Sequence, residues 1–334
     1  MKKTVIDTAG RTVSIRQPVK RIVLLSTAAA RAVQILGADD RVVGINETIQ
    51  NYPFYFPVIA QKPLLGTWKE VDWEKIASLE PDLVIAYAYA PGPINVTVAE
   101  EKLKSSGIPV VGLNLYISDR YEQLFGEFEK LALLLGKEEE AQRYLDWHAN
   151  YETGIQDFIE QKERPKVFLT RSTGALGKTT NIRTYGPYAN LSILCEKAGG
   201  KPLIPNGTTR YPKISAEKVL EENPEVVILS AAHIFGWWDS PAAPKNLVDK
   251  LLKGKGWDTM NATINNRIYV VPYSIICGLE HTYGIALLTK IFYPDLDIEP
   301  AEVYKEFLED FMRVGYPEGQ DKVLAYSGST IFVT

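Results

Sequence analysis

The sequence predicts an α/β protein with two similar lobes, each built on a central, mostly parallel sheet, joined by one long spine helix. Three observations predict this fold: an amphipathic helical stretch in mid-chain, alternating strand and helix patterns on both sides of it, and an internal repeat. We expect the two lobes at residues 1–118 and 164–334, with a helix pair between them at residues 119–163.

The helix pair is predicted by apolar residues that recur with a helical period. In the first helix these residues are Tyr121, Leu124, Phe125, Phe128, Leu131, Ala132 and Leu135. Asp119 is expected to cap this helix, and Gly136 to end it, because glycine adopts a positive φ at little cost. The second helix begins at Glu138 and meets no proline before Pro165. It should run about 25 residues, or roughly 37 Å, which is long enough to join two lobes.

Short apolar runs separated by helical patterns predict the strands of both lobes. The runs lie at residues 22–25, 42–45, 83–87 and 110–113 before the helix pair, and at 167–170, 226–229 and 268–271 after it. Residues 7–11 are typical of a hairpin turn at Gly10, and Ser26 or Thr27 can cap a helix over residues 28–36. Residues 46–67 are expected to form a long loop, either functional or a lid packed on its own aromatics.

The internal repeat pairs Val71–Ile85 with Ile214–Ile228, each a short helix followed by a buried strand. The two copies share a glutamate, a proline seven residues later and an aromatic six residues earlier: Glu74 with Glu217, Pro81 with Pro224, and Trp68 with Tyr211. Because one copy lies on each side of the helix pair, the two lobes are predicted to be structural repeats of each other.

Composition excludes several classes of protein. The chain is 46% hydrophobic and 23% charged, as is ordinary for a globular protein, and its net charge of −4 argues against nucleic acid as a partner. No apolar run approaches the length of a membrane span. Cys195 and Cys277 are too few for a disulfide framework and are expected to be buried. The start at Met1–Thr4 is basic without an apolar core, so the residues leave open a cytoplasmic protein or one whose signal segment is absent from this sequence.

Several sequence segments, and the order in which they occur, resemble those of a known protein family. They are Arg21-Ile-Val-Leu-Leu-Ser, Leu36-Gly-Ala-Asp-Asp-Arg-Val-Val-Gly, Leu79-Glu-Pro-Asp-Leu-Val-Ile after Glu74, Leu134-Leu-Gly-Lys-Glu-Glu-Glu-Ala, Arg164-Pro-Lys-Val-Phe-Leu, and the repeat at Glu217. Over residues 4–315 the chain resembles the substrate-binding proteins of ABC importers in which one rigid helix joins two α/β lobes. That family includes cobalamin, ferric-siderophore and haem binders and their zinc and manganese relatives; the tail at residues 323–334 lies outside the resemblance.

The resemblance implies a function and partners. It implies an extracytoplasmic monomer, periplasmic or anchored at the cell surface, that delivers an iron(III) chelate of the siderophore type or a corrinoid to a permease dimer and its ATPase. Haem and a bare zinc or manganese ion are alternatives, and no cofactor is expected. Glu74 and Glu217 would dock the permease in this family; first-turn glutamates also suit the helix dipole without any partner.

The candidate ligand site follows from the carboxyl ends of the parallel strands, beyond which ligands bind in open α/β sheets. Further candidates come from the segment ahead of each repeat and from the segment after residue 46. The candidate residues for ligand contact are Tyr52, Trp68, Tyr87, Tyr89, Tyr116, Arg171, Arg210, Tyr211, His233, Trp237, Trp238 and Tyr273, together with Thr27, Arg31 and Ser172. Aromatic walls suit a large flat ligand, and the resemblance puts Tyr52, Trp68, Tyr87 and Tyr211 where cobalamin-type binders place them. The arginines indicate an anionic ligand instead. Some of these residues are expected to be core or rim residues.

Two other classes of function find weaker support. A bare-metal site needs three or four ligands, but the chain has three histidines, and His148 on the helical stripe is expected to be a core residue. His233 and His281 could converge with a tyrosine but lack ligand spacing. An enzyme is suggested only by Gly174–Thr179, a degenerate phosphate loop that has Ser172 in place of its first glycine. We therefore expect no catalysis.

Overall fold

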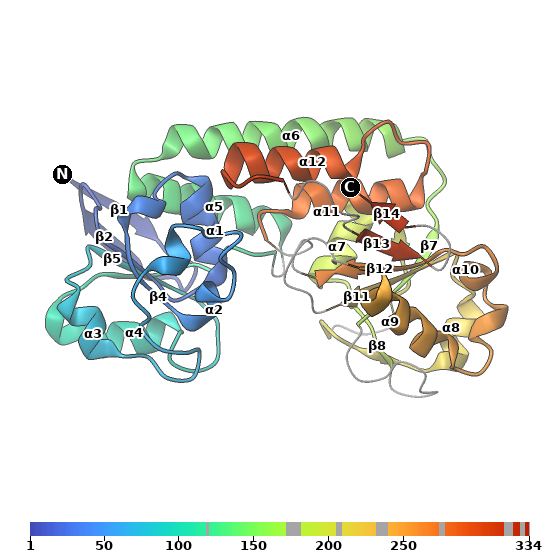
Figure 1. Cartoon of the computed structure of the whole chain (residues 1–334), viewed down its shortest axis with the longest axis horizontal. Coiled ribbons are helices and arrows are strands. Elements are labelled where there is room, and N and C mark those ends of the chain that lie inside the picture. Colours follow the sequence, from blue (N-terminus) through green and yellow to red (C-terminus); the bar gives the residue numbers. More distant parts are fainter. Residues whose placement is uncertain are drawn as a thin grey trace. The chain divides into compact units, whose positions relative to one another are not determined.

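The computed structural model describes residues 1–117, 120–171, 182–204, 209–231, 240–273, 278–316, 323–327 and 331–333. They form two compact units (Figure 1). The first unit comprises Met1–Ile117, Glu122–Trp147 and Leu308–Gly315, and the second comprises Ser118–Tyr121, His148–Phe307 and Tyr316–Thr334. The predicted fold class is confirmed, because each unit is an α/β body with its own largely parallel sheet.

The first unit is built on a four-stranded, fully parallel sheet in the order β4-β3-β5-β6. Its strands are β3 (Ile22–Leu24), β4 (Val42–Ile45), β5 (Leu83–Ala86) and β6 (Val110–Gly112), as the apolar runs predicted. Ser26 caps α1 (Thr27–Ile35) by accepting from Ala29 N. The antiparallel hairpin of β1 (Lys2–Ile6) and β2 (Thr12–Arg16) turns at Gly10, whose φ is +78°.

The second unit is built on a six-stranded sheet in the order β14-β13-β12-β11-β7-β9. The parallel strands β7 (Lys166–Arg171), β9 (Lys201–Pro202), β11 (Val226–Ala231) and β12 (Ile268–Pro272) form its larger part. The C-terminal tail, which the resemblance did not cover, adds the antiparallel strands β13 (Val323–Ser327) and β14 (Ile331–Val333) at one edge. A separate antiparallel pair joins β8 (Ile182–Arg183) to β10 (Lys213–Ile214).

The predicted helix pair is present as α5 (Tyr121–Leu135) and α6 (Glu138–Ile159). Gly136 separates them with a φ of +67°, as expected. The spine helix α6 has 22 residues, and its residues up to Trp147 belong to the first unit while those from His148 belong to the second. One continuous helix therefore takes part in both units. The expected cap, Asp119, lies outside the described residues.

The helices of the repeat begin in the same way in both copies. Asp72 caps α3 (Trp73–Ser78) by accepting from Lys75 N at 2.9 Å. Ser215 caps α8 (Ala216–Glu222) by accepting from Lys218 N at 3.2 Å. Glu74 and Glu217 are therefore each the second residue of their helix, and both are exposed.

The two copies of the repeat also end alike. Glu80 and Asn223, each the residue before the shared proline, have positive φ values of 44° and 45°. Non-glycine residues seldom adopt this left-handed conformation, so its occurrence at the same place in both copies is a strong match. In each copy the chain then enters a buried parallel strand, β5 or β11.

The remaining helical elements complete the two units. None of the helices among the described residues has the length and apolar character needed to cross a membrane. Their bounds are α2 (Glu47–Gln50), α4 (Val96–Leu103), α7 (Asn190–Lys197), α9 (Ala242–Leu252), α10 (Asn261–Ile264), α11 (His281–Phe292), α12 (Pro300–Glu306), the 3₁₀ turns Asp39–Arg41, Ile59–Gln61, Lys104–Ser106 and Trp257–Thr259, and the π-turn Phe307–Phe311. Cys195 on α7 is buried as expected, while Cys277 lies outside the described residues.

The expectation of one long loop over residues 46–67 is wrong in part. Asn46 caps the short helix α2 by accepting from Thr48 N, and a 3₁₀ turn follows at Ile59–Gln61. Tyr55 and Phe56 are buried in the first unit, so part of the aromatic run serves packing. Tyr52 is only half-buried and remains a candidate for ligand contact.

His148 is a hydrogen-bonded core residue, as its place on the helical stripe predicted. Its Nδ1 lies 2.9 Å from Thr282 Oγ1, and its Nε2 lies 2.9 Å from Glu152 Oε2 and 3.1 Å from the hydroxyl of Tyr121. The ring of His281, fully buried at the start of α11, lies 4.6 Å from the ring of His148. Burial and then the nearby His148 lower the pKa of His281 well below its ordinary value of 6.5.

This shift predicts that the second unit loses stability in mild acid. Below about pH 6.5 the unfolded chain protonates His281 while the folded chain does not, so the free energy of unfolding falls by about 1.4 kcal/mol per pH unit. His281→Asn, which keeps a donor for the Gly278 carbonyl, should remove this part of the slope. Urea unfolding at several pH values between about 4.5 and 7.5 measures it. The variant retains the neighbouring residues His148, Glu152, Lys197 and Tyr121. If the parent protein and the variant show the same dependence of unfolding free energy on pH, its assignment to His281 is wrong.

Candidate ligand-binding site

The first unit gathers an arginine and three tyrosines near the carboxyl ends of its strands; we call Arg31, Tyr52, Tyr87 and Tyr116 the first-unit cluster. Tyr87 directly follows β5 and Tyr116 follows β6, so the parallel sheet brings them to one edge. Their ring centroids lie 6.4 Å apart, with the planes tilted by 60°. Arg31 comes from α1, and its guanidinium carbon lies 5.4 Å from the ring centre of the buried Tyr55.

Charges within this cluster act on Tyr52. Burial raises the pKa of Tyr52 above its ordinary value of 10, Arg31 opposes this rise, and Tyr87 adds to it. Both neighbours are therefore close enough to interact with the Tyr52 hydroxyl. At neutral pH that hydroxyl is protonated and can donate a hydrogen bond to an electronegative ligand atom.

The second unit gathers two arginines and two tyrosines, which we call the second-unit cluster: Arg171, Arg210, Tyr211 and Tyr273. Arg171 ends β7 and Tyr273 follows β12, and the strand between them, β11, pairs with both in parallel. The guanidinium carbon of Arg171 lies 5.4 Å from the ring centre of Tyr273 and 5.5 Å from that of Tyr211. Arg210 lies 5.7 Å from the ring centre of Tyr211. Both guanidinium groups are thus held on the same aromatic side chain.

A close approach of two backbone segments brings Tyr185 to Tyr211. Gly186 N donates to Arg210 O at 2.9 Å, and a Cβ on Gly186 would lie only 2.1 Å from Thr209 O, so this position requires glycine. The ring of Tyr185 then meets that of Tyr211 edge-on at 5.7 Å, and its hydroxyl lies 2.5 Å from Ser230 Oγ.

Tyr185 and Asn190 support the second-unit cluster, although neither is among the predicted site residues. Asn190 Nδ2 donates to the hydroxyl of Tyr273 at 3.0 Å and so orients that phenol. An aromatic residue directly before Gly186-Pro187 was the available signal for Tyr185, since this dipeptide marks a turn. Nothing in the sequence around Asn190 distinguishes it from an ordinary residue at the start of a helix.

The other predicted site residues have contacts outside the two clusters or lie outside the described residues. Trp68 lies in the turn closed by the bridge between Gly66 and Val71, 48% exposed, with the Lys69 ammonium 4.9 Å from its ring centre. Tyr89 is 64% exposed, and its hydroxyl donates to Thr8 O at 2.8 Å. Outside the described residues are His233, Trp237, Trp238, Ser172 and the phosphate-loop candidate Gly174–Thr179.

The side chains of both clusters have the chemistry of anion binding. Guanidinium groups donate paired hydrogen bonds to carboxylate, phosphate and other oxyanions, and phenols can donate to the same oxygens or bind a metal held in a chelate. Within the described parts of the chain, no group of three or more His, Cys, Asp or Glu side chains could hold a metal ion. The guanidinium groups of both clusters suit an anionic ligand.

The two repeat glutamates lie in different surroundings. Glu74 lines an open hollow of about 590 Å³ together with Glu70, Asp72 and Trp73. Glu217 shares α8 with Lys218 and Glu222, which border a second hollow of about 490 Å³ that also includes Lys166 and Lys201. Both carboxylates are exposed at a helix start, where they can meet a basic partner.

Comparison with known proteins identifies the family. Residues 22–274 match the family described as periplasmic binding protein, which is well over half of the chain. The chain belongs to this family. Its members are substrate-binding proteins of transporters rather than enzymes, and they work at the periplasmic side or as lipoproteins together with ABC transporter components.

Individual relatives of this periplasmic binding protein are distant. The molybdate-binding protein MolA of Haemophilus influenzae is 22% identical over 345 aligned residues, covering 94% of this chain and 92% of that protein. The vitamin B12-binding protein of Vibrio parahaemolyticus is 24% identical, covering 79% and 90%. Among solved structures, the TroA-like periplasmic binding protein FepB of Veillonella parvula superposes with a TM-score of 0.79 at 20% identity, covering 97% of this chain and 99% of that one. At such identities the structural likeness shows the fold.

Proposed function

We propose that this periplasmic binding protein captures a negatively charged iron(III) chelate of the siderophore type outside the cytoplasm and delivers it to an ABC importer. The observation that supports this best is the second-unit cluster, where Arg171 and Arg210 both lie against Tyr211. Two guanidinium cations against one aromatic ring concentrate positive charge around Tyr211, and a bound anion would neutralise that charge. The first-unit cluster, taken by itself, also combines an arginine with phenols, so it has the same ligand chemistry.

A corrinoid fits these side chains less well. The relatives include vitamin B12-binding proteins, and the tyrosines would suit such a ligand. The arginines suit it less well, because a corrin is rimmed mainly by neutral amides and carries a single phosphodiester, so several guanidinium groups would lose water for few charged partners. Haem carries carboxylates that arginines can bind, and a haem-binding protein of Pseudomonas aeruginosa shares the fold, so haem belongs in the same experiment.

A simple oxyanion is the second candidate. The relative MolA is named for molybdate binding and aligns with nearly the whole chain. Guanidinium groups and phenol hydroxyls are suitable donors to a tetrahedral oxyanion. The two candidates differ in size. The larger iron chelate would also contact the aromatic surface of the tyrosines, whereas an oxyanion would use only their hydroxyl groups.

Calorimetric titration separates the candidates. The probes are iron(III) citrate, sodium molybdate, haemin and cyanocobalamin. We expect iron(III) citrate to bind. Tyr211→Ala should weaken this binding by about 1–3 kcal/mol. Tyr211→Phe, which keeps the ring and removes the hydroxyl, should weaken it less. If molybdate is the probe that binds, and Tyr211→Phe and Tyr211→Ala weaken its binding equally, the oxyanion is favoured. Binding of cyanocobalamin alone would contradict the proposal.

Delivery requires a docking surface, and we propose the two repeat glutamates for this role. The matched caps, the matched positions in the first turn and the matched left-handed residues show that Glu74 and Glu217 occupy equivalent places in the two units. A permease made of two equivalent halves can offer one basic pocket to each. This role needs no catalysis by the protein itself.

A further inference from the structure

A buried carboxylate, Glu127, lies on α5 beneath the segment that carries Tyr116. Glu127 is only 1% exposed to solvent. Its Oε1 accepts from Thr8 Oγ1 at 2.7 Å and from Gln123 Nε2 at 2.9 Å, and its Oε2 accepts from the backbone N–H of Leu115. Burying a carboxylate is costly unless it is hydrogen-bonded, so a residue this well bonded constrains the groups that it bonds.

The backbone that Glu127 bonds is in an uncommon conformation. Leu115 has a φ of +55°, in the left-handed region that residues with a side chain seldom adopt. Its side chain is buried, and its N–H is directed to Glu127. The next residue is Tyr116, whose ring meets that of Tyr87. The hydrogen bond from Leu115 N therefore fixes the turn that sets the direction of the Tyr116 side chain.

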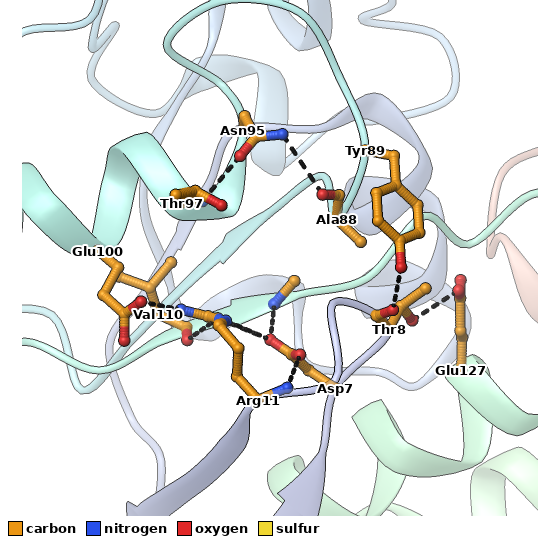
Figure 2. A network of polar contacts seen from close by, with 11 residues as sticks. Asp7, Thr8, Arg11, Ala88, Tyr89, Asn95, Thr97, Glu100, Val110 and Glu127 are labelled. Carbon is orange, nitrogen blue, oxygen red and sulfur yellow. Dashed lines mark hydrogen bonds and ion pairs between the residues drawn. The ribbon is translucent and has the colours of Figure 1, made fainter.

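The same carboxylate reaches a second loop of the site through Thr8 (Figure 2). The Thr8 hydroxyl donates to Glu127, while the Thr8 carbonyl accepts from the hydroxyl of Tyr89. The backbone N–H of Tyr89 donates to Oδ1 of Asn114, which is buried next to Leu115. Both the segment after β5 and the segment after β6 are thus tied to Glu127.

We propose that Glu127 is a positioning residue for ligand binding: it holds Leu115 in its left-handed conformation and so keeps Tyr116 against Tyr87 in the first-unit cluster. The proposal rests on the proposed function, in which this cluster contacts the ligand. Glu127 itself does not touch the ligand. Its carboxylate acts by joining α5, the β1–β2 hairpin and the two tyrosine-bearing segments.

The first measurement needs no ligand. With ring-labelled tyrosine, a nuclear Overhauser effect between Tyr87 and Tyr116 reports their contact in the free protein, and it should be lost in Glu127→Ala. Glu127→Met, which fills the volume, should lose it too and covers the case in which the alanine variant does not fold. Glu127→Gln keeps an acceptor for Leu115 N and should retain the contact. Persistence of the contact in both the alanine and the methionine variants would overturn the positioning role.

A matched control separates positioning from general loss of stability. Asp7 is also a buried carboxylate of this network, bonded to Arg11 as Figure 2 shows. It also accepts from Gly112 N, and these bonds of its carboxylate go to neither Leu115 nor Tyr89. Asp7→Asn should lower the melting temperature while retaining the Tyr87–Tyr116 contact. Loss of the contact in this control as well would reduce Glu127 to a structural residue and overturn the proposal.

The second measurement connects the contact to binding. In calorimetry with iron(III) citrate, Glu127→Ala or Glu127→Met should weaken binding on the order of tenfold, whereas Glu127→Gln and Asp7→Asn should stay within about twofold of the parent protein. Lost ring contact with unchanged affinity would overturn the role in ligand binding. If the parent protein does not bind the probe, the proposed ligand class is wrong, and the ring-contact measurement still decides whether Glu127 positions Tyr116.

Discussion

Reversing both repeat glutamates in one chain, with Glu74→Lys and Glu217→Lys, is expected to abolish stimulation of the importer's ATPase and to leave ligand affinity unchanged. Both carboxylates are exposed in the first turn of their helices, so lysine can replace them without loss of packing. Each would then place a cation against a basic pocket of the permease, and like charges at an interface cost several kcal/mol. ATPase activity of the importer reconstituted in vesicles measures the effect.

The control for this prediction changes the same total charge elsewhere. Two Glu→Lys replacements add four charges, which takes the net charge from −4 to zero. Glu101→Lys on α4 and Glu221→Lys on α8 do the same at exposed positions outside the matched pair. This control should stimulate the ATPase as the parent protein does. Normal stimulation by the Glu74, Glu217 variant would show that these glutamates serve only their helix ends.

Removing both arginines of the second-unit cluster, with Arg171→Ala and Arg210→Ala, should weaken binding of iron(III) citrate by about 100-fold or more. A hydrogen bond to a charged group contributes about 1.5–3 kcal/mol, and two such donors are lost. The tyrosine rings remain, so a ligand bound chiefly by aromatic surface would be little affected. Calorimetry at constant ionic strength measures the change, because salt screens part of the attraction.

An arginine outside the clusters controls for the change in net charge. Arg16 lies exposed on β2, and Arg16→Ala should leave the affinity near that of the parent protein. Each single variant, Arg171→Ala or Arg210→Ala, should lose less than the double variant. Undiminished affinity in the double variant would remove the second-unit cluster from the ligand site.

The sequence was sufficient to predict the fold because its signals were local and repeated. Strands β3, β5 and β11 are short apolar runs bounded by turns, and α6 has a helical stripe without proline. The repeat was read from Glu74 and Glu217, and the structure extends the match to their caps and to the left-handed residues that follow. These features depend on neighbouring residues, which the sequence displays directly.

The candidate site was less predictable because it depends on contacts between distant segments. Tyr185 meets Tyr211 only because Gly186 admits the backbone of residues 209–210, and no sequence pattern joins those two segments. Residues 46–67 combine core aromatics with Tyr52, and composition alone does not separate packing from binding. Strand β13 in the tail pairs with β12, and the paired residues, Tyr269 with Ser327 and Val270 with Tyr326, are 58 and 56 positions apart in the chain.

The metal content and absorption spectrum of the protein purified from its native host test the proposed ligand class most directly. We expect about one iron per chain, with a broad charge-transfer band that disappears when a competing chelator removes the metal. The double variant Arg171→Ala, Arg210→Ala, purified in the same way, should carry little iron. A cobalt corrin spectrum, or a bound ligand retained in full by the double variant, would show that the ligand is not an anionic iron chelate held by these arginines.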